Sequence, residues 1–247
     1  MQKNERVKMR SWFFFLLLLF CCCTSIHRKT VLVGIDPTFY PAPIGLQQDA
    51  ILGFTLDLLD AVSVKIGYKL KPYNMSWDNL IDGLKMHKYP LIISTFCPTP
   101  STCNQFAFTA VFLETGPLLV VPKFSPIKDL CDLDDKIVGI ERRPQEIGLI
   151  TTFPAIDFVF YNSVEEALSW TIDEEFDAAL VPNILARAYV NNLFENGLAI
   201  ANHNPVITEG FRFISLIEKN ELLLAEITRA IESLQDEIHR LMQKWSL

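Results

Sequence analysis

Residues 55–73, TLDLLDAVSVKIGYKLKPY, carry the alternation on which the fold prediction rests. Apolar residues recur at helical spacing through residues 55–66, which predicts an amphipathic helix. Gly67 follows as a candidate C-cap, because glycine tolerates the left-handed conformation that ends many helices. Residues 68–73 then predict a strand. A helix that leads directly into a strand is the repeating unit of an α/β protein.

The neighbouring segments continue this alternation through the first part of the chain. Residues 31–35 (VLVGI) predict a strand, and residues 77–86 (WDNLIDGLKM) predict an amphipathic helix with Ser76 as a candidate N-cap. Residues 91–96 are apolar almost throughout, which is typical of a strand buried on both faces. Strands and helices in this order predict mostly parallel sheets flanked by helices.

The same pattern returns in the second part of the chain. It predicts further strands, two helices and a long C-terminal helical stretch with room for one interruption. The strands are expected at residues 136–140, 158–161, 177–181 and 210–216, the helices at 164–172 (after Ser163) and 184–191, and the helical stretch at 221–245.

Two extended segments, residues 115–122 and 206–218, are placed to connect two separate bodies. A chain that leaves one lobe, builds a second and returns needs two such crossovers. We therefore predict a two-lobed fold with residues 26–115 plus 210–247 in lobe one and residues 116–209 in lobe two. Small ligands usually bind in clefts between domains, and a hinge allows such a cleft to close.

The N-terminus has the pattern of a secretory leader. Lys3, Arg6, Lys8 and Arg10 form a basic region, and residues 12–20 (WFFFLLLLF) form a short apolar run. A membrane-spanning helix needs about 20 apolar residues, so this run is too short for one. A basic head before a short apolar core predicts a signal peptide and an exported protein.

Three cysteines follow the apolar run and predict a lipid anchor. In bacterial lipoproteins a cysteine after the apolar run receives a diacylglyceryl group, and a small residue normally precedes it. Cys21 follows Phe20, which is a poor fit, so Cys22 or Cys23 is the expected lipidation site. Ordinary cleavage of a leader spanning residues 1–23 is the alternative. The predicted location is the periplasm, with the protein tethered to a membrane.

The charge balance argues against nucleic-acid binding. The chain has 22 basic and 29 acidic residues, and without the leader it keeps 18 and 28, a net charge of −10. Nucleic-acid binding needs basic surface that replaces counterions, and the sequence contains no basic stripe.

Three cysteines remain in the body: Cys97, Cys103 and Cys131. Cys97 and Cys103 are close enough in sequence for a disulfide in an oxidising compartment. The alternative is three reduced, mostly buried thiols. Zinc is disfavoured because no histidine or second cysteine pair stands at ligand spacing, and no metal or other cofactor is implied.

Short fragments spread along nearly the whole body form a recognisable series. They are 33–41 (VGIDPTFYP), 53–58 (GFTLDL), 76–81 (SWDNLI) with 83–85, 99–100 (TP) with 108–109, 114–116 (ETG), 177–181 (DAALV) and 244–245 (KW). In this order and at these spacings, the chain resembles the periplasmic solute-binding proteins of polar amino-acid ABC transporters. The resemblance implies a two-lobed type 2 periplasmic-binding fold, with each lobe a mixed, mostly parallel sheet flanked by helices and two crossover strands as the hinge.

The resemblance implies that two aromatic side chains of lobe one sandwich the ligand. By position these are Phe39 and Trp77. Aromatic faces offer a large contact area with few rotors to freeze, and they hold an apolar chain or a cation. The alternative for both residues is an ordinary place in the core.

Two charged anchors of the family are replaced in this sequence. The family holds the ligand carboxylate with an arginine two residues after the Thr-Pro step, where this chain has Thr102. It holds the ligand amine with an aspartate after the Asp-Ala strand, where this chain has Pro182, followed by Asn183. Proline offers neither a side-chain acceptor nor an N–H. Thr102 and Asn183 remain as candidate ligand contacts.

Arg143 is the candidate replacement for the missing cation. It stands where the family has the glycine of a Gly-Thr step at the start of a helix, so it can bring a positive charge into the cleft from lobe two. An exposed position in solvent is the alternative, because arginine is mostly exposed. Thr95 and Cys97 lie where the family offers groups to the ligand amine, although a thiol is a weak donor.

The function predicted from these features is the capture of a small polar solute, an amino acid or related compound, and its delivery to an ABC-type permease. The chain is not expected to be an enzyme. An enzyme of the cyclohexadienyl dehydratase type on the same fold is one alternative, with Glu141 and Glu146 as the nearest acid or base. A binding protein for a non-amino-acid ligand, or one that signals to a separate receptor, is another.

Overall fold

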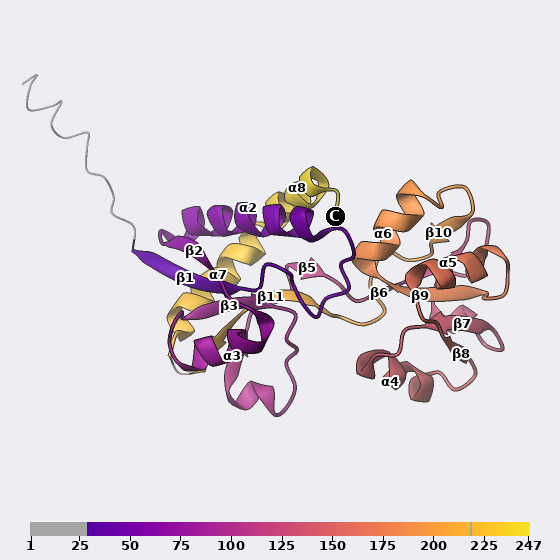
Figure 1. The fold of residues 1–247 in the computed structure, drawn as a ribbon, viewed down its shortest axis with the longest axis horizontal. Helices are drawn as coiled ribbons and strands as arrows, with labels where there is room; N and C mark the ends of the chain where they lie inside the picture. Colours follow the sequence, from indigo (N-terminus) through magenta and orange to yellow (C-terminus); the bar gives the residue numbers. More distant parts are fainter. Residues whose placement is uncertain (1–28, 218) are drawn as a thin grey trace, which may run out of the picture.

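The computed structural model describes residues 29–217 and 219–247 and forms two lobes side by side (Figure 1). Each lobe is built on its own mixed sheet, and helices cover the sheet's faces. The predicted leader and the lipidation site at Cys22 or Cys23 lie outside the described residues. No helix in the described part of the chain combines the length and the apolar character needed to cross a membrane.

The first lobe contains a sheet in the order β2-β1-β3-β11-β4, with β5 paired to β11. Three helices, α2, α7 and α8, lie on one face of this sheet, and α3 lies on the other. The elements of this lobe are β1 (Thr30–Ile35), α2 (Gln48–Ile66), β2 (Lys69–Asn74), α3 (Trp77–Lys85), β3 (Leu91–Ser94), η1 (Thr102–Asn104), β4 (Phe106–Phe108), β5 (Leu113–Glu114), β11 (Gly210–Leu216), α7 (Glu221–Ser233) and α8 (Gln235–Trp245).

The second lobe contains a sheet in the order β10-β6-β9-β7-β8. Helices α5 and α6 pack on one face of this sheet, and α4 packs near the other. The elements of this lobe are β6 (Pro117–Pro122), η2 (Leu130–Asp132), β7 (Ile137–Ile140), α4 (Pro144–Thr152), β8 (Asp157–Phe160), α5 (Val164–Ile172), β9 (Ala178–Pro182), α6 (Asn183–Asn192) and β10 (Leu198–Ile200).

Strand alternation divides the core of each lobe between the two faces of its sheet. In β9, Ala179 and Val181 join the cluster under α5 and α6, whereas Ala178 and Leu180 join the cluster on the opposite face. Successive strand residues point to opposite faces, so an apolar strand such as β9 fills both layers at once.

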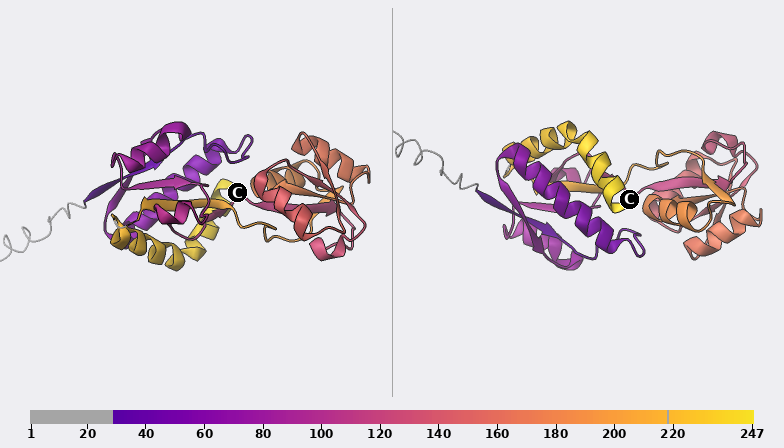
Figure 2. Two further views of the ribbon diagram at one scale, coloured as in Figure 1. Left: turned by 90° about the horizontal axis from the view of Figure 1, so that it is seen from below. Right: turned by 90° about the horizontal axis from the view of Figure 1, so that it is seen from above.

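The chain crosses between the lobes twice, once before β6 and once before β11 (Figure 2). The two crossings are hydrogen-bonded to each other, because Thr115 N–H donates to the Glu209 carbonyl at 2.8 Å. Ile184 of α6 also packs into the core cluster of the first lobe. The predicted residue limits of the two lobes stay a prediction.

Most predicted elements are present within one or two residues. The predicted helix at 55–66 is longer in the structure, because α2 begins at Gln48, and it ends as predicted at Gly67 with φ 75°. The C-terminal stretch is interrupted once, at Leu234. Parallel pairing holds for β2-β1-β3 and for β8-β7-β9, and the strands after the crossovers pair antiparallel.

The C-terminal helix is fixed to α2 by a small polar contact. Trp245 Nε1 and Lys244 Nζ both donate to Asp57 Oδ2, at 2.8 and 2.7 Å. This contact holds the Trp245 ring over Gly53, where an added Cβ would lie 2.2 Å from the indole. The position therefore has room for glycine only.

We expect Gly53→Ala to lower the free energy of unfolding by about 1–3 kcal/mol, because overpacking against a pinned ring outweighs the better helix propensity of alanine. Gly148→Ala in α4 is the matched control, since nothing lies within 4 Å of an added Cβ there. Urea denaturation measures both variants. Equal stability of the two would contradict the contact with Trp245.

Candidate functional site

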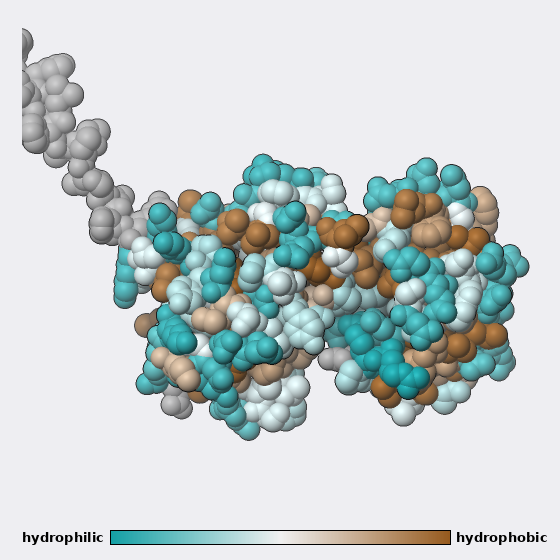
Figure 3. Space-filling model, viewed as in Figure 1, coloured by the Kyte–Doolittle hydropathy of each residue, from teal (hydrophilic) through white to brown (hydrophobic). Residues whose placement is uncertain are grey.

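A cavity of about 280 Å³ lies between the two lobes. In Figure 3 the molecular surface narrows in the same region, where the lobes meet. The lining residues come from the first lobe, from both crossings and from the second lobe. They are Pro41, Ala42, Pro43, Thr95, Cys97, Thr115, Arg143, Pro144 and Glu209.

The cavity has an apolar wall and a polar floor. Pro41, Ala42 and Pro43 form the wall on the first lobe, and Pro144 faces from the second lobe at the start of α4. The crossings contribute Thr115 and Glu209. Such a lining suits a small molecule with a polar head and a short apolar part.

Arg143 is held by three carboxylates rather than exposed to solvent. Its Nη1 lies 3.2 Å from Glu209 Oε2, its Nε lies 3.0 Å from Glu141 Oε2, and its Nη2 is paired with Glu146 Oε1. Burial alone would lower the pKa of Arg143, but the carboxylates of Glu146, Glu141 and Glu209 outweigh it and raise that pKa. Arg143 thus reaches the cavity from the second lobe, as predicted by its position, but its positive charge is already neutralised by these carboxylates.

Glu146 is the most deeply buried acid of this cluster, with a fully buried side chain. Burial raises the pKa of Glu146 to about 7, against the lowering effect of Arg143. Both of its oxygens are occupied, Oε1 by Arg143 and Oε2 by the Glu141 N–H at 2.9 Å. Glu146 therefore fixes the loop between β7 and α4.

A pair of aromatic side chains lies at the end of β1. The rings of Tyr40 and Trp77 are 6.1 Å apart at an angle of 69°. Asp36 organises this region, because its Oδ2 accepts the Trp77 N–H at 2.7 Å and its Oδ1 accepts both the N–H and the hydroxyl of Thr38. The N-terminus of α3 is thus capped by Asp36, while the side chain of Ser76 makes no capping bond.

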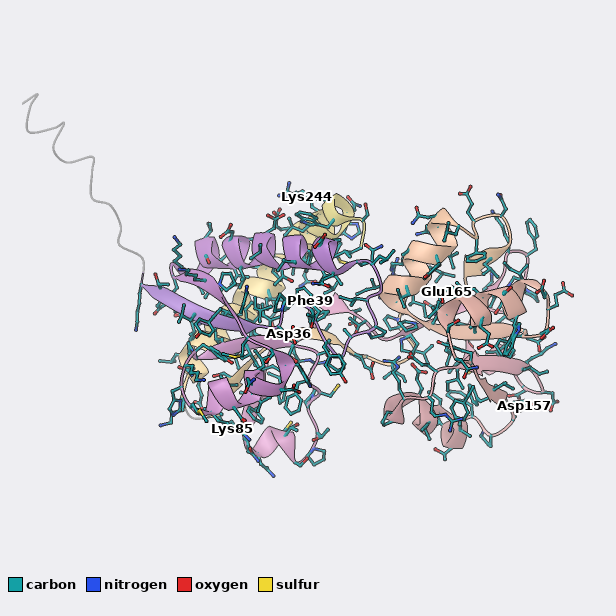
Figure 4. The ribbon with its side chains drawn as sticks, in the orientation of Figure 1. Asp36, Phe39, Lys85, Asp157, Glu165 and Lys244 are labelled. Atoms are coloured by element: carbon teal, nitrogen blue, oxygen red, sulfur yellow. The ribbon has the colours of Figure 1, made fainter. Side chains whose placement is uncertain are left out.

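Phe39 is placed in the core. Its side chain is 2% exposed, and its ring packs edge-on against Phe211 at 5.4 Å. Figure 4 shows Asp36 and Phe39 together in the interior of the first lobe. Phe39 has φ 56°, a left-handed conformation at which the chain turns, and the next residue, Tyr40, is 62% exposed. Tyr40 therefore occupies the position beside Trp77 that the sequence suggested for Phe39.

Thr102 and Asn183 are engaged in local structure. The Thr102 hydroxyl donates to the Cys97 carbonyl at 3.1 Å and accepts the Thr99 N–H at 2.7 Å, so it stabilises its own loop. Asn183 is buried, donates to the Glu114 carbonyl at 3.3 Å and accepts from Arg187 Nε at 2.6 Å. Neither residue lines the cavity. Thr95 does, together with Arg143.

The three cysteines of the described residues are free. The suggested disulfide between Cys97 and Cys103 is therefore absent. The alternative of mostly buried thiols is wrong for Cys103 and Cys131, which are both exposed. Burial and the nearby Glu209 raise the pKa of Cys97, so the thiol in the cavity is kept protonated.

The charged residues of the hinge were not predicted from the sequence. Glu114 ends β5 directly before the first crossing, Glu209 lies on the second crossing directly before β11, and Arg212 follows on β11. Arg212 is 7% exposed although it is charged. A signal was available, because charged residues in otherwise apolar crossover segments are costly to bury without a partner.

A larger hollow of about 820 Å³ lies at the far end of the second lobe. Its lining includes Lys123, Phe124, Lys136 and Asp177. It contains none of the residues of the hinge or the cleft. Within the described residues, no group of three or more His, Cys, Asp or Glu side chains is arranged to hold a metal ion.

The sequence model of the bacterial extracellular solute-binding proteins, family 3, matches residues 31–247. The arginine-binding extracellular protein ArtP of Bacillus subtilis is 26% identical over 227 residues, which cover 88% of this chain and 86% of that protein. The lysine/arginine/ornithine-binding periplasmic protein of Escherichia coli is 28% identical over 162 residues, which cover 64% of this chain and 62% of that protein.

Solved structures share the two-lobed fold at low sequence identity. The L-cystine solute receptor of Neisseria gonorrhoeae, unliganded and open, superposes with a TM-score of 0.70 at 20% identity, covering 89% of this chain and 93% of the receptor. The second substrate-binding domain of GlnP from Lactococcus lactis, also open, has a TM-score of 0.67 at 15% identity, covering 89% and 96%.

The raised pKa of Glu146 predicts a loss of stability as pH rises. Below its ordinary pKa of 4.5 the carboxyl is protonated in the folded and the unfolded chain alike. Between 4.5 and about 7 the unfolded chain releases the proton while the folded chain keeps it, so unfolding becomes easier by on the order of 3 kcal/mol. We expect Glu146→Gln to remove this dependence, measured by urea denaturation at pH 5 and pH 8.

Glu232→Gln, at an exposed position of α7, is the control and should keep the pH dependence of the wild type. If Glu146→Gln loses as much stability between the two pH values as the wild type does, Glu146 does not hold the extra proton.

Proposed function

The chain belongs to the bacterial extracellular solute-binding proteins of family 3, and from that premise we propose that it binds an amino-acid-like solute between its lobes and delivers it to an ABC-type permease. The observation that carries the proposal is the cavity to which both lobes and both crossings contribute. A solute in such a cavity touches both lobes at once, so it can favour their closure.

The named relatives support a solute of amino-acid character. ArtP and the lysine/arginine/ornithine-binding protein are both named for basic amino acids. In this chain, Tyr40 directly precedes the cavity-lining residues Pro41 to Pro43, and its ring lies 6.1 Å from that of Trp77. We propose that these two rings contact the solute's side chain, with Thr95 as a polar contact.

Closure of the lobes is the proposed signal for delivery. A solute favours the closed form only as far as it makes better contacts there than in the open form. The crossings form the only covalent connections between the two sheets in the described chain, so they are the proposed hinge. The permease would then bind the closed arrangement of the lobes in preference to the open one.

Export and a lipid anchor at Cys22 or Cys23 belong to the same proposal. An anchored binding protein stays close to its permease, which raises the local concentration of loaded protein. The relatives named as extracellular or periplasmic support an exported location.

An enzymatic role is not favoured. A carboxyl with a pKa near 7 suits acid–base catalysis, and Glu146 has one. Both Glu146 oxygens are already bonded within the protein, however, and the side chain is fully buried. The relatives reported above are named as binding proteins, which supports binding without turnover.

A thermal-shift screen of the full chain against amino acids, followed by titration calorimetry, tests the proposal. A true solute raises the melting temperature by mass action, and it should be recovered unchanged after incubation. A chain that binds nothing in this screen, or that converts the solute, would overturn the proposal.

For the solute found in this way, we expect Trp77→Ala to weaken binding about tenfold or more, because it removes one of the two aromatic faces proposed to contact the solute. Phe124→Ala is the matched control: this ring is exposed and lies at the far end of the second lobe, so the dissociation constant should stay the same. Calorimetry on both variants makes the comparison. Unchanged affinity in Trp77→Ala would remove Trp77 from the site.

A further inference from the structure

Charged residues of the two crossings lie close together beside the cavity. Glu114 on β5 lies opposite Gly210 on β11, next to Glu209, and Arg212 follows on the same strand. Arg143, Glu141 and Glu146 approach from the second lobe. Four acidic side chains thus accompany two guanidinium groups, and the formal charge of the cluster is negative even when Glu146 holds its proton.

Three buried carboxylate oxygens in this cluster, Glu114 Oε2, Glu141 Oε2 and Glu209 Oε1, have no hydrogen-bond donor among the described residues. Glu141 Oε2 still lies 3.0 Å from Arg143 Nε in an ion pair, so Glu114 Oε2 and Glu209 Oε1 are the two that lack a cationic partner as well. Glu209 is 7% exposed and lines the cavity, while its other oxygen is bound by Arg143. A buried acceptor without a donor is costly, so this atom marks a place where a donor is needed.

The internal cations do not meet this need. Arg143 is shared among three carboxylates, and its Nη1 reaches Glu209 only through Oε2. Arg212 is buried, and its positive charge acts to lower the pKa values of Glu114 and Cys97. It makes no ion pair within 4.0 Å in the part of the chain that is described. An additional positive charge at Glu209 would therefore improve the balance of the cluster.

The size and lining of the cavity indicate which kind of molecule could bring this positive charge. Its volume of about 280 Å³ accommodates a small organic molecule, and its prolines offer an apolar wall beside the charged floor. An ammonium or guanidinium group on a short aliphatic stem has both properties. The stem would lie along Pro41 to Pro43, and the cationic group would reach Glu209.

We infer that Glu209 binds the cationic group of a small organic cation, an ammonium or a guanidinium, so that the hinge itself recognises the charge of the solute. The inference rests on the proposed function and adds the anchor and the chemical class of the solute. Cationic amino acids and the corresponding decarboxylated amines share this chemistry. Because Glu209 lies on a crossing and is bonded to Arg143 of the second lobe, the bound cation acts directly on the joint between the lobes.

Arg143 is a built-in competitor for the same carboxylate. Removing it frees Glu209 Oε2 and Glu146 Oε1 and leaves unpaired buried charges, which destabilises the empty protein. A cationic solute would then recover more stability than it does in the wild type. Glu209→Gln acts in the opposite direction, because it keeps the shape of the side chain and removes the charge.

The experiment is calorimetry and thermal shift on the full chain with defined probes. The cations are arginine, lysine, ornithine, agmatine and putrescine, and the comparison probes are neutral glutamine and anionic glutamate. We expect the cations to bind and the comparison probes to bind at least tenfold more weakly. Agmatine and putrescine test whether a carboxylate on the solute is needed.

Two variants and a control decide whether Glu209 is the anchor. Glu209→Gln should weaken the cations tenfold or more, whereas Glu232→Gln on exposed α7 should leave them unchanged. Arg143→Gln should lower the melting temperature of the unliganded protein and increase the shift that a cation produces. This opposite response is one that a purely structural role of Glu209 would not give.

The outcomes separate the two levels of the argument. A wild type that binds only neutral or anionic solutes, or that binds cations equally well in Glu209→Gln, overturns the hinge anchor and leaves the binding function intact. A smaller cation-induced shift in Arg143→Gln also overturns it. A wild type that binds no probe and nothing in the wider screen overturns the proposed function as well.

Discussion

The close contact of the two crossings is the constraint on which the rest of the structure depends. Thr115 and Gly116 both donate their N–H groups to the Glu209 carbonyl, at 2.8 and 3.3 Å. The approach is so tight that a Cβ on Gly116 would lie 1.8 Å from the Ile207 carbonyl oxygen. Because the chain passes this point twice, the two sheets are held side by side, and the cavity between them follows from that arrangement.

The same contact explains why the carboxylate of Glu209 lies in the cavity. Glu209 stands on one crossing and lines the cavity, and Glu114 lies on β5 opposite Gly210, the residue after Glu209. The guanidinium of Arg143 then connects Glu209 to the start of α4. Any change in the angle between the lobes must lengthen or rebuild that ion pair, so the electrostatics of the cavity and the position of the lobes are linked.

The fold was largely predictable from the sequence because the buried strands consist of continuous apolar runs. A short apolar run such as β9 is typical of a strand covered on both sides, and residues 210–216 match β11 at both ends. The start of α2 was not predictable in this way, because Gly53 is a poor helix former and its role appears only when Trp245 packs on it. Tertiary contact overrides propensity at that position.

The candidate site was less predictable, since position in a motif does not fix the direction of a side chain. Phe39 was expected in the cleft, but the left-handed turn at this residue goes with a ring in the core and leaves Tyr40 outside. Arg143 was expected to compensate for the missing arginine at Thr102. The partners that neutralise it are one carboxylate two residues before it, one three residues after it and one 66 residues away, and no spacing rule indicates the last of these.

These departures have a common physical reading. The resemblance implies anchors for a ligand carboxylate and amine at two positions where this chain has Thr102 and Pro182. The charged residues that line the cavity are instead Arg143, which three carboxylates already pair, and Glu209. Under the proposed function, a cavity of this kind favours a cationic solute over an anionic one, because its remaining unpaired charge is a carboxylate.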